Sequence, residues 1–293
     1  MTAAPPRISI VTPSYNQAPF LEDAMRSVLD QRYPNLEYVV VDGGSTDGSA
    51  EIIRRYEGRL TGWASEPDGG QYDAINKGFA RTTGEIMAWL NSDDMYTPWA
   101  FSVVAEIFSR FPDVEWLTTL FMLIWDQGGR AVACLPEDGF TRRAFLRGEH
   151  LEVPGWPHRR NIQQESTFWR RSLWERAGGR VDAGLRLAGD FDLWARFFAH
   201  ADLVGIETPL AGFRVHRDQK TASCMEQYIA EAKEVLARNG GQRPSAVGAF
   251  LRLRFAKFIP GRFRPIATFL GLRERRRVCR FEGRDEGWRI LEQ

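Results

Sequence analysis

The sequence is poor in cysteine and histidine, with three cysteines and four histidines among 293 residues. Cys134, Cys224 and Cys279 are odd in number and far apart, which fits neither a disulfide framework nor a zinc site. An excess of one charge is also missing: the formal net charge is +1, which argues against a protein that binds nucleic acid over its whole surface. We therefore expect a reducing compartment, the cytosol.

Long apolar runs are missing as well. The longest, Trp116 to Trp125, is about half of the roughly 20 residues that a membrane-spanning helix needs, and we expect it in the core. The first residues, MTAAPPRISIV, lack a charged segment followed by an apolar one, so no secretory signal is expected. With 43% hydrophobic residues the chain can fill a core, and we expect most of it to fold.

What the sequence does contain, up to about Phe111, is an alternation of short apolar runs and segments of helical periodicity. Strand and helix in turn predict an α/β fold with a mostly parallel sheet and helices on both faces. Ligands bind such sheets beyond the carboxyl ends of the strands. The predicted strands are Ile8–Thr12, Tyr38–Val41, Trp63–Ser65 and Ile86–Leu90, and the predicted helices lie around Leu21–Leu29, Ile52–Ile53, Tyr72–Ala80 and Trp99–Phe111.

Three of these strands run into polar residues, in the sequences VTPSYN, VVVDGG and WLNSDD. The last ends in Asp93 and Asp94, carboxylates of the kind that bind Mg²⁺ or Mn²⁺ together with substrate phosphates. The alternative is a solvated turn that caps the next helix. Asp42, followed by two glycines, and the segment SEPDGGQYDAINKG, with Asp68 and Asp73, are expected to bring further polar groups to the same crevice.

A second acidic group lies in AGDFDLWAR, which contains Asp190 and Asp192. Because they are two residues apart on a predicted helix, they point in different directions and serve different tasks. Asp190, at the N-terminus of this helix, is placed either to act as a general base in a cleft or to cap the helix. Asp192 is placed to pair with Arg196 at the i, i+4 spacing.

Taken together and in order, seven segments resemble the family 2 glycosyltransferases, and the chain looks like a bacterial member with the GT-A fold. The resemblance implies a Rossmann-like, mostly parallel sheet flanked by helices. It extends from about Ile8 to His216, and the ordered combination is much more specific than any single motif. The segments are VTPSYN, VVVDGGSTDGS, SEPDGGQYDAINKGF, TTGEIMAWLNSDDMYTP, STFWRRSLWERAGG, LAGDFDLWAR and FRVH.

The resemblance implies which residues bind the nucleotide. Pro13 and Tyr15 match the segment that lines the nucleotide base, and Asp42 matches the acid that contacts base or ribose. Asp73 falls in the nucleotide-side segment.

It also implies the residues for metal and catalysis. Asp93 and Asp94 match the DXD-type motif, which binds the ribose and the metal that bridges the diphosphate. Asp190 matches the catalytic base, and His216 lies where some GT-A enzymes have a histidine that completes the metal site. The alternative for His216 is a solvated histidine at a strand end.

Two positions depart from the family pattern. Many members have an acid in place of Asn91 and a glutamate in place of Gly189, which leaves open which carboxylate meets the cation and removes a helper beside the base. The acceptor is expected in the irregular section that contains Trp156, Gln164 and Glu165. Trp156 is placed to stack on a sugar face.

Two units are predicted: a GT-A domain at 1–238, with a nucleotide-sugar half at about 1–115 and an acceptor half at about 116–238, and a small, mainly helical appendage at 239–293. The appendage begins at the turn-rich NGGQRP and is basic, with apolar residues interleaved. This suits peripheral contact with the cytoplasmic face of an inner membrane. The alternative is a helical tail with solvated arginines, and nucleic-acid binding is not expected.

These features predict an inverting glycosyltransferase in the synthesis of bacterial surface polysaccharide or glycolipid. Its donor is a nucleoside-diphosphate sugar, first of all a UDP-sugar, its acceptor a saccharide or lipid-linked saccharide, and its cofactor Mn²⁺ or Mg²⁺. Two alternatives remain. A Mg²⁺-dependent sugar nucleotidyltransferase would use the same acids, and a non-catalytic protein would bind a sugar nucleotide without turning it over.

Overall fold

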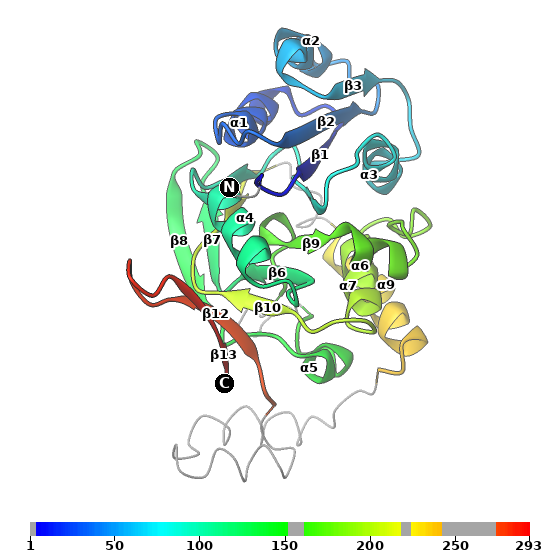
Figure 1. The fold of residues 1–293 in the computed structure, drawn as a ribbon. Helices are drawn as coiled ribbons and strands as arrows, with labels where there is room; N and C mark the ends of the chain where they lie inside the picture. The colour runs from blue at the N-terminus through cyan, green and yellow to red at the C-terminus, as the bar shows by residue number, and fades with distance from the viewer. Residues whose placement is uncertain (1–3, 152–160, 218–223, 242–273) are drawn as a thin grey trace.

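The computed structural model describes residues 4–151, 161–217, 224–241 and 274–293 (Figure 1). Two sheets form the framework of this described part. The larger has nine strands in the order β13-β12-β10-β6-β9-β4-β1-β2-β3, and the smaller has four in the order β5-β11-β7-β8. The larger sheet is flanked by helices, so the α/β fold expected from the sequence is confirmed.

The N-terminal half alternates strand and helix as expected. β1 pairs in parallel with β2 and β4, and β2 pairs in parallel with β3, so the carboxyl ends of these strands meet at one edge. Figure 1 shows α1 and α4 on one face of this part of the sheet and α3 on the other. The elements are β1 (Ile8–Ser14), α1 (Ala18–Leu29), β2 (Leu36–Asp42), α2 (Ser49–Arg55), η1 (Glu57–Arg59), β3 (Gly62–Ser65), α3 (Gln71–Phe79), β4 (Ile86–Trp89), β5 (Met95–Tyr96) and α4 (Ala100–Arg110).

The second half joins this sheet through one antiparallel strand. β9 (Phe168–Arg170) pairs antiparallel with both β4 and β6, and the long apolar run divides into β6 (Trp116–Thr119) and β7 (Phe121–Trp125), which belong to different sheets. The remaining elements before the C-terminal hairpin are β8 (Ala131–Pro136), α5 (Arg142–Leu146), η2 (Gln164–Ser166), α6 (Arg171–Arg176), α7 (Gly189–Phe197), β10 (Val204–Ile206), β11 (Ala211–Arg214) and α9 (Met225–Arg238).

Four buried tryptophans hold the two halves together. The ring of Trp194, on α7, stacks between Trp89 of β4 and Trp116 of β6, at centroid distances of 6.0 and 5.6 Å. Trp169 of β9 meets both Trp89 and Trp194 edge-on. Each such aromatic pair contributes about 0.5–1.5 kcal/mol beyond the area it buries. These contacts fix α7, and therefore Asp190 one turn earlier, relative to the end of β4.

The last described residues differ from the expected helical appendage. β12 (Arg277–Phe281) and β13 (Trp288–Glu292) form an antiparallel hairpin, and β12 pairs in parallel with β10, so the hairpin continues the main sheet. The reason lies in the sequence, where the short runs RVCRF and WRILE flank a turn with Gly283 and Gly287, as strands of a hairpin do. Residues 242–273 lie outside the described residues, so the boundary at 238 stays a prediction.

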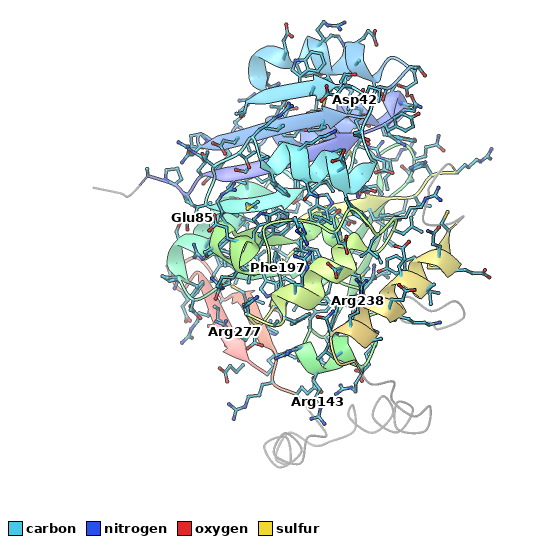
Figure 2. All side chains as sticks on the ribbon, turned by 90° about the vertical axis from the view of Figure 1, so that its right-hand side faces the viewer. Asp42, Glu85, Arg143, Phe197, Arg238 and Arg277 are labelled. Carbon is cyan, nitrogen blue, oxygen red and sulfur yellow. The ribbon has the colours of Figure 1, made fainter. Side chains whose placement is uncertain are left out.

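The hairpin and the residues just before it do not form an open basic face, because five of their arginines are paired with acids. Figure 2 shows Arg277 at this edge of the molecule. The other basic residues expected to meet a membrane, from Arg252 to Arg273, lie outside the described residues, so the membrane contact stays a prediction. No described helix is both long and apolar enough to cross a membrane. The pairs are Arg275–Glu292, Arg276–Asp138, Arg277–Asp113, Arg280–Glu207 and Arg289–Glu282.

Candidate active site

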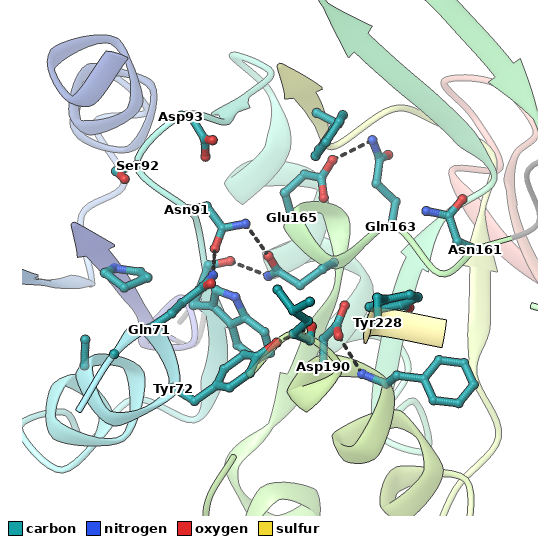
Figure 3. Close-up of a pocket in the computed structure, with 18 of the residues that line it drawn as sticks. Gln71, Tyr72, Asn91, Ser92, Asp93, Asn161, Gln163, Glu165, Asp190 and Tyr228 are labelled. Atoms are coloured by element: carbon teal, nitrogen blue, oxygen red, sulfur yellow. Dashed lines mark hydrogen bonds between the residues drawn. The ribbon is translucent and has the colours of Figure 1, made fainter. Parts of the chain in front are cut away.

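A pocket of about 680 Å³ lies where the carboxyl ends of β1, β2 and β4 meet the second half of the chain. Figure 3 shows Asp93 on one side of this pocket and Asp190 on the other, with Glu165 between them in this view. The three carboxylates come from the end of β4, from η2 and from the N-terminus of α7. The structure therefore brings together acids that are far apart in the sequence.

The end of β1 forms one wall of the pocket. Pro13 and Tyr15 both line it, and the Tyr15 side chain is exposed. Ser14 lines it too, and its buried hydroxyl has no hydrogen-bond partner among the described residues. Sequence reasoning missed Ser14, although its place between two predicted binding residues was a signal. A buried hydroxyl without a partner is a natural contact for a polar ligand.

Asp42 was expected to contact the nucleotide directly, but it is fully buried and does not line the pocket. Its carboxylate accepts hydrogen bonds from the backbone N–H of Ser45 (2.9 Å), the Ser45 hydroxyl (2.5 Å) and the Ser65 hydroxyl (2.7 Å). These bonds hold the loop that begins at Gly43, and Gly43 is the residue that lines the pocket. Figure 2 shows Asp42 near the top of the molecule.

Asp73 likewise supports a turn. Its carboxylate accepts a hydrogen bond from the backbone N–H of Gly69 (2.9 Å) and lies 2.9 Å from the ammonium of Lys77. The Gly69 bond, and then Lys77, lower the pKa of Asp73. The neighbouring Asp68 and Gln71 line the pocket instead. The glycine pair Gly69–Gly70 predicts a turn, but it does not predict which neighbouring side chains point into the pocket.

Asp93 and Asp94 have different surroundings. Asp93 lines the pocket, whereas Asp94 is 1% exposed and does not. The carboxylate of Asp94 accepts the backbone N–H of Arg214 (2.9 Å) and the side-chain amide of Asn91 (3.2 Å). Burial, and then the charges of Glu165 and Asp93, raise the pKa of Asp94 well above its ordinary value. Asp94 therefore supports the site, and Asp93 is the carboxylate that can meet a ligand.

His216 completes this side of the site. Its Nε2 lies 3.1 Å from Oδ2 of Asp93, and its ring packs 4.4 Å from that of Phe20. One carboxylate oxygen and one imidazole nitrogen fit Mn²⁺ or Mg²⁺ when the other ligands come from substrate phosphates and water. Among the described residues no larger group of His, Cys, Asp or Glu is placed as a metal site. Asp93 lines the pocket, whereas the His216 side chain is 1% exposed and does not, so Asp93 is the accessible member of the pair that fits a cation.

The amide at position 91 suits its neighbours better than the acid found in many family members. Asn91 Oδ1 accepts from the amide of Gln71 (2.7 Å), and Asn91 Nδ2 donates to Asp94 Oδ2 and to Gln164 Oε1 (both 3.2 Å). A carboxylate at this position has no hydrogen to donate and would face the Asp94 carboxylate. Figure 3 shows this chain of amides along the pocket.

The acceptor residues named from the sequence are only partly described. Gln164 and Glu165 line the pocket, while Trp156 lies outside the described residues. Gln164 donates to the backbone carbonyl of Trp89 (2.8 Å), and Glu165 accepts from the amide of Gln163 (2.8 Å). Burial raises the pKa of Glu165 to about 7, and the charges of Asp93 and Asp190 add to this effect.

Asp190 lies in the first turn of α7 and lines the pocket. Burial raises the pKa of Asp190 to about 6, so it is mostly ionised at neutral pH and still basic enough to accept a proton. Asp192 pairs with Arg196 at 2.9 Å, which confirms the structural task expected of it. The pocket therefore places Asp190, a carboxylate that can accept a proton, opposite the accessible carboxylate of Asp93.

The described charged side chains of the pocket wall are all acidic. They are Asp68, Asp93, Glu165 and Asp190, and the described part of the wall has neither lysine nor arginine. An anionic ligand such as a diphosphate would be repelled by such a wall unless a cation is bound with it.

Comparison with known proteins places this chain in one family. Residues 9–120 match the model of glycosyl transferase family 2. An uncharacterized glycosyltransferase of Mycobacterium tuberculosis is 32% identical over 198 residues, which cover 67% of this chain and 70% of the relative. An uncharacterized glycosyltransferase of Rickettsia prowazekii is 26% identical over 223 residues, covering 76% of this chain and 68% of the relative. TuaG of Bacillus subtilis, named for teichuronic acid biosynthesis, is 40% identical over 99 residues, which cover 33% of this chain and 39% of TuaG.

Solved structures show the same fold. S. aureus TarS 1–349 in complex with UDP-GlcNAc superposes with a TM-score of 0.58 at 18% identity, over 92% of this chain and 76% of that one. The mannosyltransferase PcManGT of Pyrobaculum calidifontis, in complex with GDP-Man and Mn²⁺, gives a TM-score of 0.55 at 18% identity, over 92% of this chain and 85% of that one. The chain belongs to glycosyltransferase family 2 and is a glycosyltransferase with the GT-A fold.

Proposed function

We propose that this glycosyltransferase moves a sugar from a nucleoside-diphosphate donor to an acceptor hydroxyl with inversion at the anomeric carbon, and that Asp190 is the base. One observation carries the proposal. Asp190 and Asp93 line the same pocket, although they come from different halves of the chain. A base opposite a diphosphate site is the arrangement that a single displacement needs, because the acceptor must attack the face opposite the leaving group.

We propose that the nucleotide lies along the ends of β1 and β2. Pro13 and Tyr15, on the wall of the pocket, would meet the base. Asp42 and Asp73 would act through the loop at Gly43 and the turn at Gly69 that they hold. The related structures contain UDP-GlcNAc and GDP-Man, and of these donor types we propose a UDP-sugar.

We propose Asp93 and His216 as the residues that hold a divalent cation, Mn²⁺ or Mg²⁺, with Asp94 behind them. A bound cation would neutralise the negative charge that develops on the leaving diphosphate. The acidic wall of the pocket supports this assignment, since the described residues there offer the diphosphate no positive side chain.

Asp190 would accept the proton of the acceptor hydroxyl as its oxygen attacks the anomeric carbon. The bond from that carbon to the diphosphate breaks with its electron pair leaving on the phosphate oxygen, so one step gives the inverted product. No covalent sugar–enzyme intermediate is needed. A positioned base contributes about 10²–10⁴-fold to the rate.

The acceptor would enter beside Gln164 and Glu165, with the expected contribution of Trp156 outside the described residues. We propose a saccharide or lipid-linked saccharide acceptor, in the synthesis of a bacterial surface polysaccharide or glycolipid. The similarity to TuaG, whose name refers to teichuronic acid biosynthesis, supports this class of product.

A screen of sugar nucleotides tests the donor side first. With Mn²⁺ or Mg²⁺ present, the right donor should raise the melting temperature, because it binds only the folded protein. Omission of the metal should remove most of this shift. If no sugar nucleotide stabilises the protein with either metal, the proposed donor class is wrong.

Transfer to an acceptor tests the base. Asp190→Asn keeps the shape of the side chain and should lower kcat by about 10²–10⁴-fold. Asp192→Asn is the matched control, because Asp192 lies on the same helix and pairs with Arg196. Asp192→Asn should lower the melting temperature, because it breaks the pair with Arg196, but it should lower kcat much less than Asp190→Asn does. Similar kcat values in the two variants would remove Asp190 from the mechanism.

The same assay separates the two alternatives. A nucleotidyltransferase would release pyrophosphate from a nucleoside triphosphate and a sugar phosphate, whereas the proposed enzyme releases a nucleoside diphosphate. A non-catalytic binding protein would show the thermal shift but no transfer, and Asp190→Asn would then change nothing. Membership of family 2 favours the transferase.

A further inference from the structure

Gly189, directly before the proposed base, has no room for a side chain. A Cβ atom at this position would lie 2.6 Å from Cε2 of Tyr72 and 2.7 Å from its Cζ, closer than real Cβ contacts. Tyr72 itself is 6% exposed, so its ring cannot simply swing into solvent. The ring of Tyr72 therefore occupies the space that a glutamate at position 189 would need.

The hydroxyl of Tyr72 binds the backbone on both sides of the residue that precedes α7. It donates to the carbonyl of Leu187 (2.6 Å) and accepts the N–H of Gly189 (2.9 Å), with Ala188 between them. Burial, and then the charge of Asp190, raise the pKa of Tyr72 well above its ordinary value, so the phenol keeps the proton that it donates. These two bonds fix the turn from which Asp190 emerges.

Tyr72 also lines the pocket, on the side formed by α3 and the residues just before it. It is the second residue of α3 and follows Gln71, whose amide binds Asn91. Asp68 and Gly70, just before it, line the pocket. Figure 3 shows the Tyr72 side chain pointing from α3 toward Asp190. One side chain thus connects the segment on the proposed donor side with the turn that carries the proposed base.

We propose that Tyr72 is a positioning residue for Asp190, and that it takes over the supporting task of the acid missing at position 189. The inference rests on the proposed role of Asp190 as the base. In this scheme the phenol does not react but holds the backbone at 187–189. Tyr72 thereby links residues 68–71, against which the donor would bind, to the turn that carries the base.

The chain contains a matched control for this contact. Asn76, one turn further along α3, also binds the segment before α7 through two hydrogen bonds, to the carbonyl and to the N–H of Val181 (both 2.9 Å). Asn76→Ala therefore removes as many bonds between α3 and this segment as Tyr72→Phe does. Only Tyr72→Phe removes them next to Asp190.

Steady-state kinetics give the first test. Tyr72→Phe should lower kcat by roughly 10- to 100-fold, because a slight misplacement of a catalytic group is costly, while KM for the donor should change by no more than about threefold. Asn76→Ala should lower the melting temperature and keep kcat within about threefold. If the two variants lose kcat to the same extent, Tyr72 has only a structural role.

A double-mutant cycle gives a sharper test. Gly189→Glu alone should lose activity because the new side chain meets the Tyr72 ring, and Tyr72→Ala alone should lose it because the turn is unsupported. Combining the two changes opens the space and restores an acid before the base. The relative kcat of the double variant should therefore exceed the product of the relative kcat values of the two single variants by about tenfold or more. Strictly multiplicative losses would contradict the proposal.

Hydrogen exchange tests the contact without any transfer assay. The Gly189 amide should exchange at least about tenfold faster in Tyr72→Phe than in the wild type or in Asn76→Ala. UDP-sugar with Mn²⁺ should slow exchange at 186–190 in the wild type and not in Tyr72→Phe. A wild type that neither binds nor transfers would refute the proposed function, whereas an active wild type with unchanged kcat and exchange in Tyr72→Phe would refute the positioning role alone.

Discussion

Nε2 of His216 lies 3.1 Å from Oδ2 of Asp93, although one residue follows β11 and the other follows β4. The His216 side chain is 1% exposed, whereas that of Asp93 is 25% exposed and lines the pocket. The ring is held in place by Phe20 of α1. A rigid imidazole beside an accessible carboxylate is well placed to bind a cation, since neither ligand has to be ordered first.

His216→Ala should weaken metal binding more than it weakens binding of the donor. We expect the Mn²⁺ concentration for half-maximal activity to rise by roughly 10–100-fold, with most of kcat recovered at saturating Mn²⁺. A metal titration at fixed donor and acceptor measures it. His200→Ala is the control, because His200 is exposed in the turn that follows α7. Equal metal dependence in the two variants would remove His216 from the metal site.

The rate of transfer should depend on pH through Asp190. Only the ionised carboxylate accepts a proton, and burial raises the pKa of Asp190 to about 6. We therefore expect kcat to rise as the pH increases through about 6 and to level off near neutrality. A profile of kcat at saturating donor and metal, from about pH 5 to about pH 8, measures this limb. A profile that is flat across this range would contradict the assignment of the base.

Much of the first half of the site could be predicted from the sequence, because strand ends are local features. The apolar run before Asp93 marks β4, and parallel neighbours bring its end to those of β1 and β2. The pattern could not say which way each side chain points. Asp42, Asp73 and Asp94 do not line the pocket, and each accepts a hydrogen bond from a backbone N–H group of a neighbouring segment instead.

Contacts between distant segments could not be predicted. Tyr72 meets Gly189 only because α3 and α7 are packed against the same sheet, and a single sequence contains no signal of such a pair. The C-terminal hairpin was missed for a related reason. Its strands are short and contain several charged residues, so their hairpin pattern is weak in the sequence, and the pairing of RVCRF with β10 adds a contact that the sequence does not reveal. Arg277 and Arg280 look like part of a basic patch in the sequence because their acidic partners, Asp113 and Glu207, lie far away in the chain.

Glu165 should make the stability of the metal-free protein depend on pH. Burial raises its pKa from an ordinary 4.5 to about 7, so its protonated form is favoured in the folded state. This contribution to the free energy of unfolding is fully present below about pH 4.5 and is lost as the pH rises through about 7. The change is on the order of 3 kcal/mol. Glu165→Gln cannot ionise and should lack this part of the pH dependence.

Urea unfolding in EDTA at several pH values measures the effect. Exposed Glu51 offers the control, because Glu51→Gln should leave the pH dependence of the wild type intact. The two variants should therefore diverge in stability as the pH rises from about 5 to about 8, with Glu165→Gln the less sensitive. Parallel curves would show that Glu165 is ionised in the folded protein at the lower pH.

The turn before Asp190 is held from its other side by Glu231 of α9. One carboxylate oxygen accepts the backbone N–H groups of Arg186 (3.1 Å), Leu187 (2.9 Å) and Ala188 (3.0 Å). A carboxylate near the N-terminus of α7 also interacts favourably with the helix dipole. Removing it leaves three donors without their acceptor, so Glu231→Ala should lower the free energy of unfolding by about 1–3 kcal/mol and lower kcat as well.

Glu234 is the matched control for this prediction, because it lies on the exposed side of the same helix. Glu234→Ala should change the free energy of unfolding by no more than about 0.5 kcal/mol and leave kcat unaffected. Urea unfolding and transfer assays on the two variants make the comparison. If both lose stability equally, the cost lies in α9 itself; if only Glu231→Ala loses stability but keeps full kcat, the turn at 186–188 does not position Asp190.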